Sequence, residues 1–346
     1  MWILAVASLL LAGSAAGGAA VPAMFVLGDS LVDPGNNNGL VTLAKADYSP
    51  YGVDFPEGVT GRFCNGGTVA DHLGELLGLP LIPPYNSPST AGSRIFHGVN
   101  YASAASGILT DTGNLYGALF PMEQQVQNFQ RTVGELRTQM GERTGDFLRR
   151  SLFLVCVGSN DYINNYLVPL SDKPREYTPA AYAFLLIQQY RRQLESLYYS
   201  GGRKFLIAGL GPLGCTPSQI GAAAGNSSDC VSRTNSLARQ FNAKLREMLR
   251  RLNGDLRGSR FLYWDTYSTS ADVIANFSLY GFRYPHTACC GGGRERGKIA
   301  CLPLLPLQCA NRSEFIFWDP FHPTDAFNAI AARRAFDVNV RQLVQS

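Results

Sequence analysis

The stretch FVLGDSLVDPGNNNG, residues 25–39, places Ser30 directly after a short apolar run that ends in glycine and aspartate. Residues 25–28 have the composition of a buried strand, and the Asn, Gly and Pro residues that follow are typical of a loop. A serine in this position either belongs to an ordinary turn or is exposed at a strand end as a nucleophile. The choice depends on what the rest of the chain brings to that strand end.

Four short apolar runs, each ending in Gly or Asp, alternate with amphipathic helical stretches. This alternation predicts an α/β fold with a mainly parallel, doubly wound sheet in a single domain, residues 21–346. Ligands bind such sheets beyond the carboxyl ends of the strands, where Ser30 and Asn160 both fall. The predicted strands are residues 23–29, 151–158, 204–211 and 260–265, and the predicted helices lie within 66–80 (N-cap Thr68), 121–141 and 236–254 (closing on Gly254).

The composition excludes several classes of protein. Of the 346 residues, 46% are hydrophobic and 16% are charged, so the chain has enough apolar residues for a large core and is not typical of a disordered protein. The net charge of +4 is small, and no block of five like charges occurs. A nucleic-acid partner is therefore not indicated.

The N-terminus has the features of a secretory signal peptide. Residues 1–20 form an apolar run that passes into Ala, Gly and Ser, and we expect cleavage between residues 16 and 23. A signal anchor is the alternative, because the positive residues that usually precede the apolar run are missing. No later segment reaches the roughly 18 apolar residues of a spanning helix, so the mature protein is expected to be soluble and secreted.

Cysteines and glycosylation sequons agree with secretion. Four of the eight cysteines lie in the Gly- and Pro-rich segment 289–309, where disulfides are expected; zinc is the rival interpretation, but no Cys-x-x-Cys pair supports it. Eight cysteines allow 105 complete pairings, and the connectivity is left open. Cys156 lies in an apolar run and is expected to be a buried free thiol. Candidate N-glycosylation sites are Asn226, Asn276 and Asn311.

Histidine is the usual base for a serine nucleophile, and the chain has four. His322 stands out because Asp319 precedes it by three residues and Pro323 follows it, so that a helix can begin near Thr324. The aspartate can then orient the imidazole, leaving Nε2 free to accept a proton. The alternative is a local cap for the following helix. His72 is interpreted as a surface residue, and His97 and His286 are not expected to act directly.

Four blocks follow one another along the chain: FVLGDSLVDPGNNN (25–38), GVNYASAASGILTDTG (98–113), VGSNDYINNY (157–166) and FWDPFHPTDAFN (317–328). The α/β-hydrolase motif Gly-x-Ser-x-Gly, His-Glu-x-x-His and the P-loop are absent. In this order the four blocks resemble the plant GDSL esterases/lipases of the SGNH hydrolase superfamily, and GLGPLGCTP (209–217) and ACCGGG (288–293) are also similar to the plant branch. The resemblance covers nearly all of the mature chain and implies a three-layer α/β/α, flavodoxin-like fold.

The resemblance implies a role for five matching positions. Ser30 matches the nucleophile, His322 the general base and Asp319 the acid that orients it. The backbone N–H groups of Ser30 and Gly107 and the side-chain amide of Asn160 match the oxyanion-hole donors. The alternatives are an Asx turn at Asn160-Asp161 and a simple loop glycine at Gly107.

We therefore expect a secreted, extracellular serine hydrolase of carboxylic esters that works through an acyl-enzyme. The resemblance implies a location in the plant cell wall or apoplast. No cofactor, metal or obligate protein partner is expected; the substrate is a small-molecule or lipid ester. An acyltransferase using the same acyl-enzyme is the main alternative, and an inactive lipid- or carbohydrate-binding relative is a third. Two positions depart from the family pattern: Pro34 in the serine loop, and Cys64 where serine is common.

Overall fold

The computed structural model describes residues 19–169, 171–224, 228–303 and 308–345. The expected signal peptide, apart from residues 19 and 20, and the sequon at Asn226 lie outside these residues. The strands are β1 Met24–Gly28, β2 Leu152–Cys156, β3 Lys204–Ala208, β4 Arg260–Trp264, β5 Tyr284–Ala288 and β6 Phe315–Phe317. The α-helices are α1 Val69–Leu76, α2 Met122–Met140, α3 Arg143–Arg150, α4 Ser159–Asp161, α5 Lys173–Glu176, α6 Pro179–Tyr199, α7 Pro217–Ala222, α8 Ser232–Asp255, α9 Thr266–Ala275, α10 Asp325–Ala335 and α11 Arg341–Val344.

Strands β1 to β4 form one parallel sheet in the order β1-β2-β3-β4, and all four coincide with predicted strands. An irregular segment extends the sheet beyond β1: Val26 pairs with Asn100 in parallel, and the N–H of Tyr101 donates to the Val26 carbonyl at 2.8 Å. Counting this segment, the spatial order is 2-1-3-4-5, which is the flavodoxin-like order. The order reverses between β1 and β2, so Ser30 follows a strand at the switch point, where ligands bind in such sheets.

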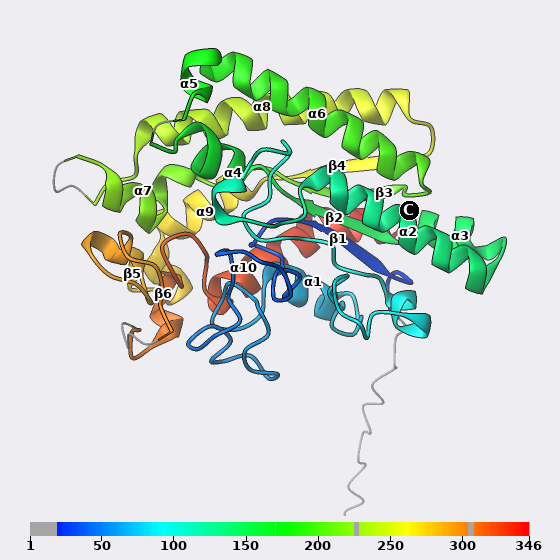
Figure 1. Ribbon diagram of the computed structural model, residues 1–346, viewed down its shortest axis with the longest axis horizontal. Helices are drawn as coiled ribbons and strands as arrows, with labels where there is room; N and C mark the ends of the chain where they lie inside the picture. The colour runs from blue at the N-terminus through cyan, green and yellow to red at the C-terminus, as the bar shows by residue number, and fades with distance from the viewer. Residues whose placement is uncertain (1–18, 170, 225–227, 304–307, 346) are drawn as a thin grey trace, which may run out of the picture.

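Helices cover both faces of this sheet. Figure 1 shows α2, α6 and α8 on one side and α1 and α10 on the other. Apolar side chains alternate along each strand between the two cores that result. On the first face, the rings of Phe25, Phe129 and Phe153 contact one another with centroids 5.2 to 5.3 Å apart. The predicted three-layer α/β/α class is confirmed.

Helix ends follow local signals, with one correction. Thr68 caps α1 in a capping box with Asp71, as its position before an apolar run predicts. The prediction that the long helix closes on Gly254 is wrong, because α8 continues to Asp255. The side chain of Asn253 bonds both backbone groups of Phe261, at 2.7 and 2.9 Å, and holds this turn of the helix against β4.

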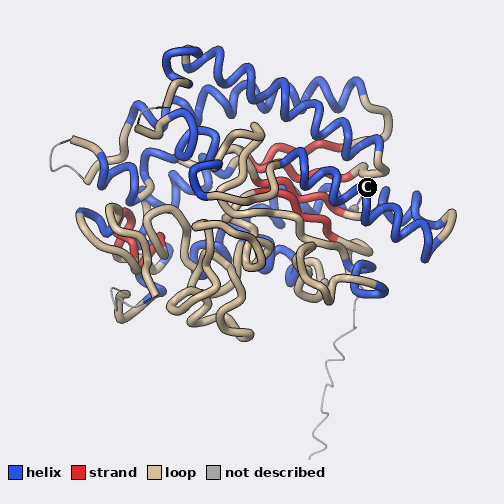
Figure 2. The backbone as a smooth tube through the Cα atoms, viewed as in Figure 1, coloured by secondary structure: helices blue, strands red, loops and turns tan. Residues whose placement is uncertain are grey.

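Strands β5 and β6 form a separate two-stranded parallel sheet, seen in orange at the left of Figure 1. Figure 2 shows how much of the chain around it is loop. Disulfides staple this module, as the crowding of cysteines predicts. Cys64 and Cys156 are free and buried, which confirms the prediction for Cys156. The disulfides are Cys215–Cys230, Cys289–Cys309 and Cys290–Cys301.

Candidate active site

Three of the predicted site residues form one continuous hydrogen-bonded chain. Ser30 Oγ lies 2.7 Å from His322 Nε2, although the two residues are 292 positions apart. His322 Nδ1 lies 2.7 Å from Asp319 Oδ2 and 2.8 Å from Oδ1. The serine, the imidazole and the carboxylate thus stand in the order that a nucleophile, its base and an orienting acid require.

Asp319 is suited to hold the imidazole because its carboxylate receives several donors. The N–H groups of Phe321 and His322 each donate to Oδ1 at 2.8 Å. Burial acts to raise the pKa of Asp319, but the neighbouring His322 and these hydrogen bonds outweigh it, and the pKa lies below its usual value. The carboxylate therefore stays ionised at neutral pH.

The loop that carries His322 is closed on itself. The N–H of Trp318 donates to the His322 carbonyl at 2.7 Å, and Phe317 pairs with Pro323 across the loop. Thr324 then caps α10, its hydroxyl accepting from the N–H of Phe327. The interpretation that Pro323 separates His322 from a helix starting near Thr324 is confirmed. The alternative, that Asp319 and His322 form the local cap of this helix, is not, because Thr324 is the cap.

Tyr51 is a neighbour of this chain that sequence reasoning missed. Its hydroxyl donates to Asp319 Oδ2 at 2.7 Å, and the side chain is buried. Burial, followed by the charge of Asp319, raises the pKa of Tyr51 well above its usual value, so the phenol remains a donor. The ring packs against Trp318 and against Phe63, which in turn contacts the His322 ring. No local sequence pattern predicts this contact, because Tyr51 and Asp319 are 268 positions apart in the chain.

The asparagines of the opening stretch fix the serine loop. Asn36 Nδ2 donates to the carbonyls of Asn100 and Ala102, at 2.9 and 2.7 Å. Asp33 accepts from the N–H groups of Asn36 and Ala104, at 2.7 and 2.9 Å. Burial raises the pKa of Asp33 to about 6 although these N–H groups lower it. The loop after β1 is therefore bound to segment 100–104 by buried polar contacts that a plain turn does not need.

Asp29, between β1 and Ser30, is also buried. One carboxyl oxygen accepts from the N–H of Leu31 at 3.1 Å, and the other has no hydrogen-bond partner within the described chain. Burial raises the pKa of Asp29 to about 7, an effect that the Leu31 N–H and the proximity of His322 reduce.

Asn160 reaches the same site from the end of β2. Its Nδ2 donates to the Ser106 carbonyl at 2.9 Å, and its Oδ1 accepts from Asn164 at 2.7 Å. An amide nitrogen carries two N–H groups, so a second donor remains for a ligand. Asn160 and Ser30 both line the cleft described below.

Gly107 is placed differently from Asn160. A Cβ at this glycine would lie 2.4 Å from Thr112 Cγ2 and 2.7 Å from Asp161 Oδ1, so close packing alone requires glycine. Gly107 is not among the residues that line the cleft, whereas Ala105, with a φ of 64°, is. The oxyanion role of Gly107 stays a prediction.

The serine and histidine open onto a cleft of about 270 Å³. Its walls come from the serine loop, segment 43–51, the carboxyl ends of β2 to β4 and the loop around His322. The charged or titratable residues among its lining residues, besides tyrosines and Cys156, are Asp29, Lys45 and His322. Such a cleft suits a largely uncharged ligand.

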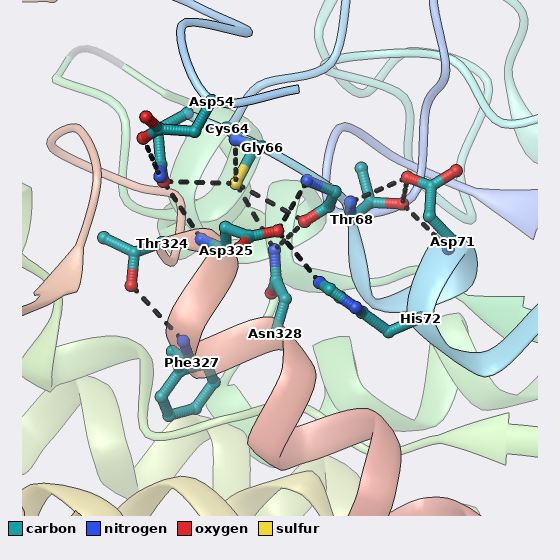
Figure 3. Close-up of polar contacts among 12 residues, drawn as sticks. Asp54, Cys64, Gly66, Thr68, Asp71, His72, Thr324, Asp325, Phe327 and Asn328 are labelled. Carbon is teal, nitrogen blue, oxygen red and sulfur yellow. Dashed lines mark hydrogen bonds and ion pairs between the residues drawn. The ribbon is translucent and has the colours of Figure 1, made fainter. Parts of the chain in front are cut away.

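Shortly after His322 in the chain, polar contacts join segment 65–72 to the first turn of α10 (Figure 3); we call this group the α10 clamp. Asp325 Oδ1 accepts from the N–H of Gly67 at 2.7 Å and lies 3.0 Å from His72 Nε2. Asn65 Oδ1 accepts from the Asp325 N–H at 3.0 Å, and Asn328 Nδ2 donates to the Gly67 carbonyl at 3.0 Å. His72 is partly exposed on α1, as the interpretation of a surface residue expects, but its ring is paired with Asp325.

Within the described part of the chain, the remaining histidines and the metal-ligating residue types form no second site. His97 is exposed in a 3₁₀ turn, and His286 lies half-buried in β5, where burial lowers its pKa. Among the residues that the structure describes, no group of three His, Cys, Asp or Glu side chains is placed to hold a metal ion. Over the same residues, no helix is both long and apolar enough to cross a membrane.

A model of the GDSL-like lipase/acylhydrolase family matches residues 24–335, which include every block quoted above. The chain belongs to this family. It is 48% identical to GDSL esterase/lipase At1g71250 of Arabidopsis thaliana, over 94% of this chain and 90% of the relative. It is 45% identical to GDSL esterase/lipase At1g71691 of the same plant, over 93% and 85%, and 45% identical to GDSL esterase/lipase 7, over 91% and 87%.

Membership in this GDSL family makes the protein a carboxylic ester hydrolase by family and confirms the predicted resemblance. Among solved structures, phospholipase A1 from Streptomyces albidoflavus NA297 aligns with 90% of this chain and 96% of its own, at 12% identity and a TM-score of 0.34. A likeness this distant adds nothing to the site.

Proposed function

We propose that the protein is a secreted serine hydrolase that cleaves carboxylic esters through an acyl-enzyme. The observation that carries the proposal is the unbroken chain Ser30–His322–Asp319, with contacts of 2.7 Å at both links, opening onto a largely uncharged cleft. A hydroxyl bonded to an imidazole that a buried carboxylate orients is the arrangement that activates serine.

In the first half of the reaction, Ser30 Oγ attacks the ester carbonyl and His322 Nε2 takes the serine proton. Asp319 keeps the Nδ1–H in place and stabilises the imidazolium. The N–H of Ser30 and the free N–H of the Asn160 amide, with Gly107 as the family resemblance implies, donate to the oxyanion. His322 then gives its proton to the leaving alcohol, and the acyl group remains on Ser30.

In the second half, water attacks the acyl-enzyme. His322 accepts a proton from the water, the carboxylic acid leaves, and the proton returns to Ser30. Each step uses groups of the chain and water alone, so the proposal requires no cofactor.

Secretion is part of the same proposal. The apolar residues 1–20 and the three disulfides support an oxidising, extracellular location for residues 21–346, which we take as one domain. Asn276 and Asn311 are exposed, as glycosylation requires. Mass spectrometry of the secreted protein, giving its N-terminal residue and its glycan masses, tests this part.

The test of the reaction is hydrolysis of p-nitrophenyl acetate, butyrate and palmitate by the secreted wild type, Ser30→Ala and His322→Ala. We expect each substitution to lower kcat by roughly 10³-fold or more. Ser89→Ala, on an exposed loop away from the cleft, is the control and should retain full activity. A fluorophosphonate probe should label the wild type and not Ser30→Ala.

Two outcomes contradict the proposal. Full activity in Ser30→Ala would remove the serine from the reaction. A folded wild type inactive on all three esters would exclude simple hydrolysis, and product analysis with an added alcohol would then test acyl transfer.

A further inference from the structure

Two hydrogen bonds orient the side-chain amide of Asn160. Its Nδ2 donates to the Ser106 carbonyl at 2.9 Å, and its Oδ1 accepts from Asn164 Nδ2 at 2.7 Å. Turning the amide by half a rotation would place its oxygen against the Ser106 carbonyl and its nitrogen against an N–H of Asn164, so both bonds would be lost. The two contacts together therefore fix the end of the amide at which its remaining N–H lies.

Asn164 is oriented in turn by Tyr116. The Tyr116 hydroxyl donates to Asn164 Oδ1 at 3.1 Å, which leaves the Asn164 nitrogen on the side of Asn160. Burial raises the pKa of Tyr116, so the phenol stays protonated and remains a donor at neutral pH. All three residues line the cleft. We call Tyr116, Asn164 and Asn160 the donor series, because each of the first two donates to the next.

The backbone supports both ends of the donor series. Asn160 and Asn164 are four positions apart, in α4 and in the π-helical turn that follows it, so their side chains lie on the same face. At the other end, the Tyr116 carbonyl accepts from the N–H of Leu43 at 2.7 Å and from the hydroxyl of Thr42 at 2.9 Å. Contacts within the protein therefore hold the series before a substrate binds.

We propose that Asn164 and Tyr116 are positioning residues for the oxyanion, which act by holding the remaining N–H of the Asn160 amide toward the ester carbonyl. The inference deepens the proposed ester hydrolysis and rests on it. When negative charge develops on the carbonyl oxygen, Asn160 donates to it while accepting from Asn164, and Asn164 accepts from Tyr116. Each bond of the series then polarises the next in the direction that strengthens donation to the oxyanion. An amide aligned before the reaction also needs no rearrangement as the charge forms.

The test is a double-mutant cycle on kcat for p-nitrophenyl butyrate. Asn164→Ala removes the donor to Asn160 Oδ1 and should lower kcat by roughly tenfold, the effect expected of one hydrogen bond. KM should change by less than about twofold, because the amide acts mainly on the transition state. In the Asn160→Ala background, the same change should lower kcat by less than about twofold, since a residue that acts through Asn160 then has nothing left to orient.

Tyr116→Phe is a milder second variant, because it keeps the ring and the backbone contacts of Tyr116. It removes only the donor to Asn164 Oδ1, so kcat should fall by about three- to fivefold when Asn160 is present. In the Asn160→Ala background, Tyr116→Phe should leave kcat unchanged.

Asn165→Ala is the matched control. Asn165 is the next residue after Asn164, but its amide donates to Asp111 and Thr112, each at 3.1 Å, and not to Asn160. The substitution should keep kcat within about twofold of its parent in either background.

An equal loss of kcat from Asn164→Ala in both backgrounds would overturn the proposal, because Asn164 would then contact the substrate itself or support the fold. So would an effect of Asn164→Ala that is confined to KM, or one that Asn165→Ala reproduces. A wild type that hydrolyses no ester, or an Asn160→Ala variant as active as the wild type, would contradict the proposed function as well.

Discussion

Ser30 and His322 meet at 2.7 Å, but the molecule holds them in different ways. Ser30 lies two residues after β1, and the N–H of Asp29 still donates to the Cys156 carbonyl on β2, so the parallel sheet itself sets its place. His322 lies five residues after β6, a three-residue strand of the minor sheet. Its loop depends on Tyr51, the α10 clamp and the disulfide-linked module.

The difference indicates where each side of the site is vulnerable. Main-chain pairing in a buried sheet tolerates most side-chain changes, whereas an anchor made of side chains is weakened whenever one of them is replaced. On the sheet side, activity should fall mainly through groups that contact the substrate. On the histidine side, it should also fall through residues that never touch the substrate.

Outside Ser30, His322 and Asp319, the largest effect is expected on the sheet side, at Asn160. Asn160→Ala removes the amide donor but leaves β2 intact, and should lower kcat by about 10²–10³-fold. Because its bonds to Ser106 and Asn164 are also lost, the free energy of unfolding should fall by about 1–3 kcal/mol. Kinetics on p-nitrophenyl butyrate measure it. Asn165→Ala, in the same segment but outside the cleft lining, is the control. An equal loss in both variants would show that the segment, and not the amide, supports activity.

On the histidine side, the disulfide Cys290–Cys301 supports the loop, because the N–H of Cys290 donates to the Trp318 carbonyl, next to Asp319. Replacing both cysteines by serine should lower the free energy of unfolding by about 3 kcal/mol and lower kcat as well. Urea unfolding and kinetics at 25 °C measure the two effects.

The disulfide Cys215–Cys230 is the control, because its sequence separation of 15 residues is close to the 11 residues of Cys290–Cys301. Its removal should affect unfolding similarly and kcat less. If both double variants lose kcat equally, the disulfide at Cys290 has no special connection with His322.

Sequence reasoning succeeded where the signal is local. The apolar runs ending in Gly or Asp predicted β1 to β4, and the motifs around Ser30 and His322 predicted the residues that the fold brings together. It failed where contacts join distant segments. Neither the pairing of Asn100 with β1 nor the contact of Tyr51 with Asp319 produces a periodic pattern in the sequence, because each depends on one residue in an irregular loop.

Tyr51 is the sharpest test of side-chain anchoring. Tyr51→Phe removes one donor from Asp319 Oδ2 and keeps the ring between Phe63 and Trp318. Since hydrogen bonds to charged groups contribute about 1.5–3 kcal/mol, kcat should fall by about tenfold or somewhat more, with KM nearly unchanged. A change confined to KM would contradict a positioning role.

Tyr48→Phe is the control for this substitution, since it removes a bond to the neutral carbonyl of Cys301 on the same segment. Its effect on kcat should be smaller than that of Tyr51→Phe.

The smallest effect is expected at the α10 clamp. Burial acts to lower the pKa of His72, but the hydrogen bond with Asp325 and its charge outweigh this, and the pKa lies above its usual value. A pKa raised in the folded state means that the contribution to stability is fully present below the unfolded pKa, near 6.5. The contribution is then lost as the pH rises through the folded pKa.

His72→Gln should therefore lower the free energy of unfolding at about pH 5, by less than about 1 kcal/mol because the pair is partly exposed. It should have almost no effect at about pH 9. Urea unfolding at both pH values, with kcat measured alongside, decides the matter. A loss of the same size at both pH values would mean that His72 acts by packing. An unchanged kcat at pH 5 would mean that the α10 clamp contributes to stability only, and that Tyr51 and the disulfide hold His322 in position.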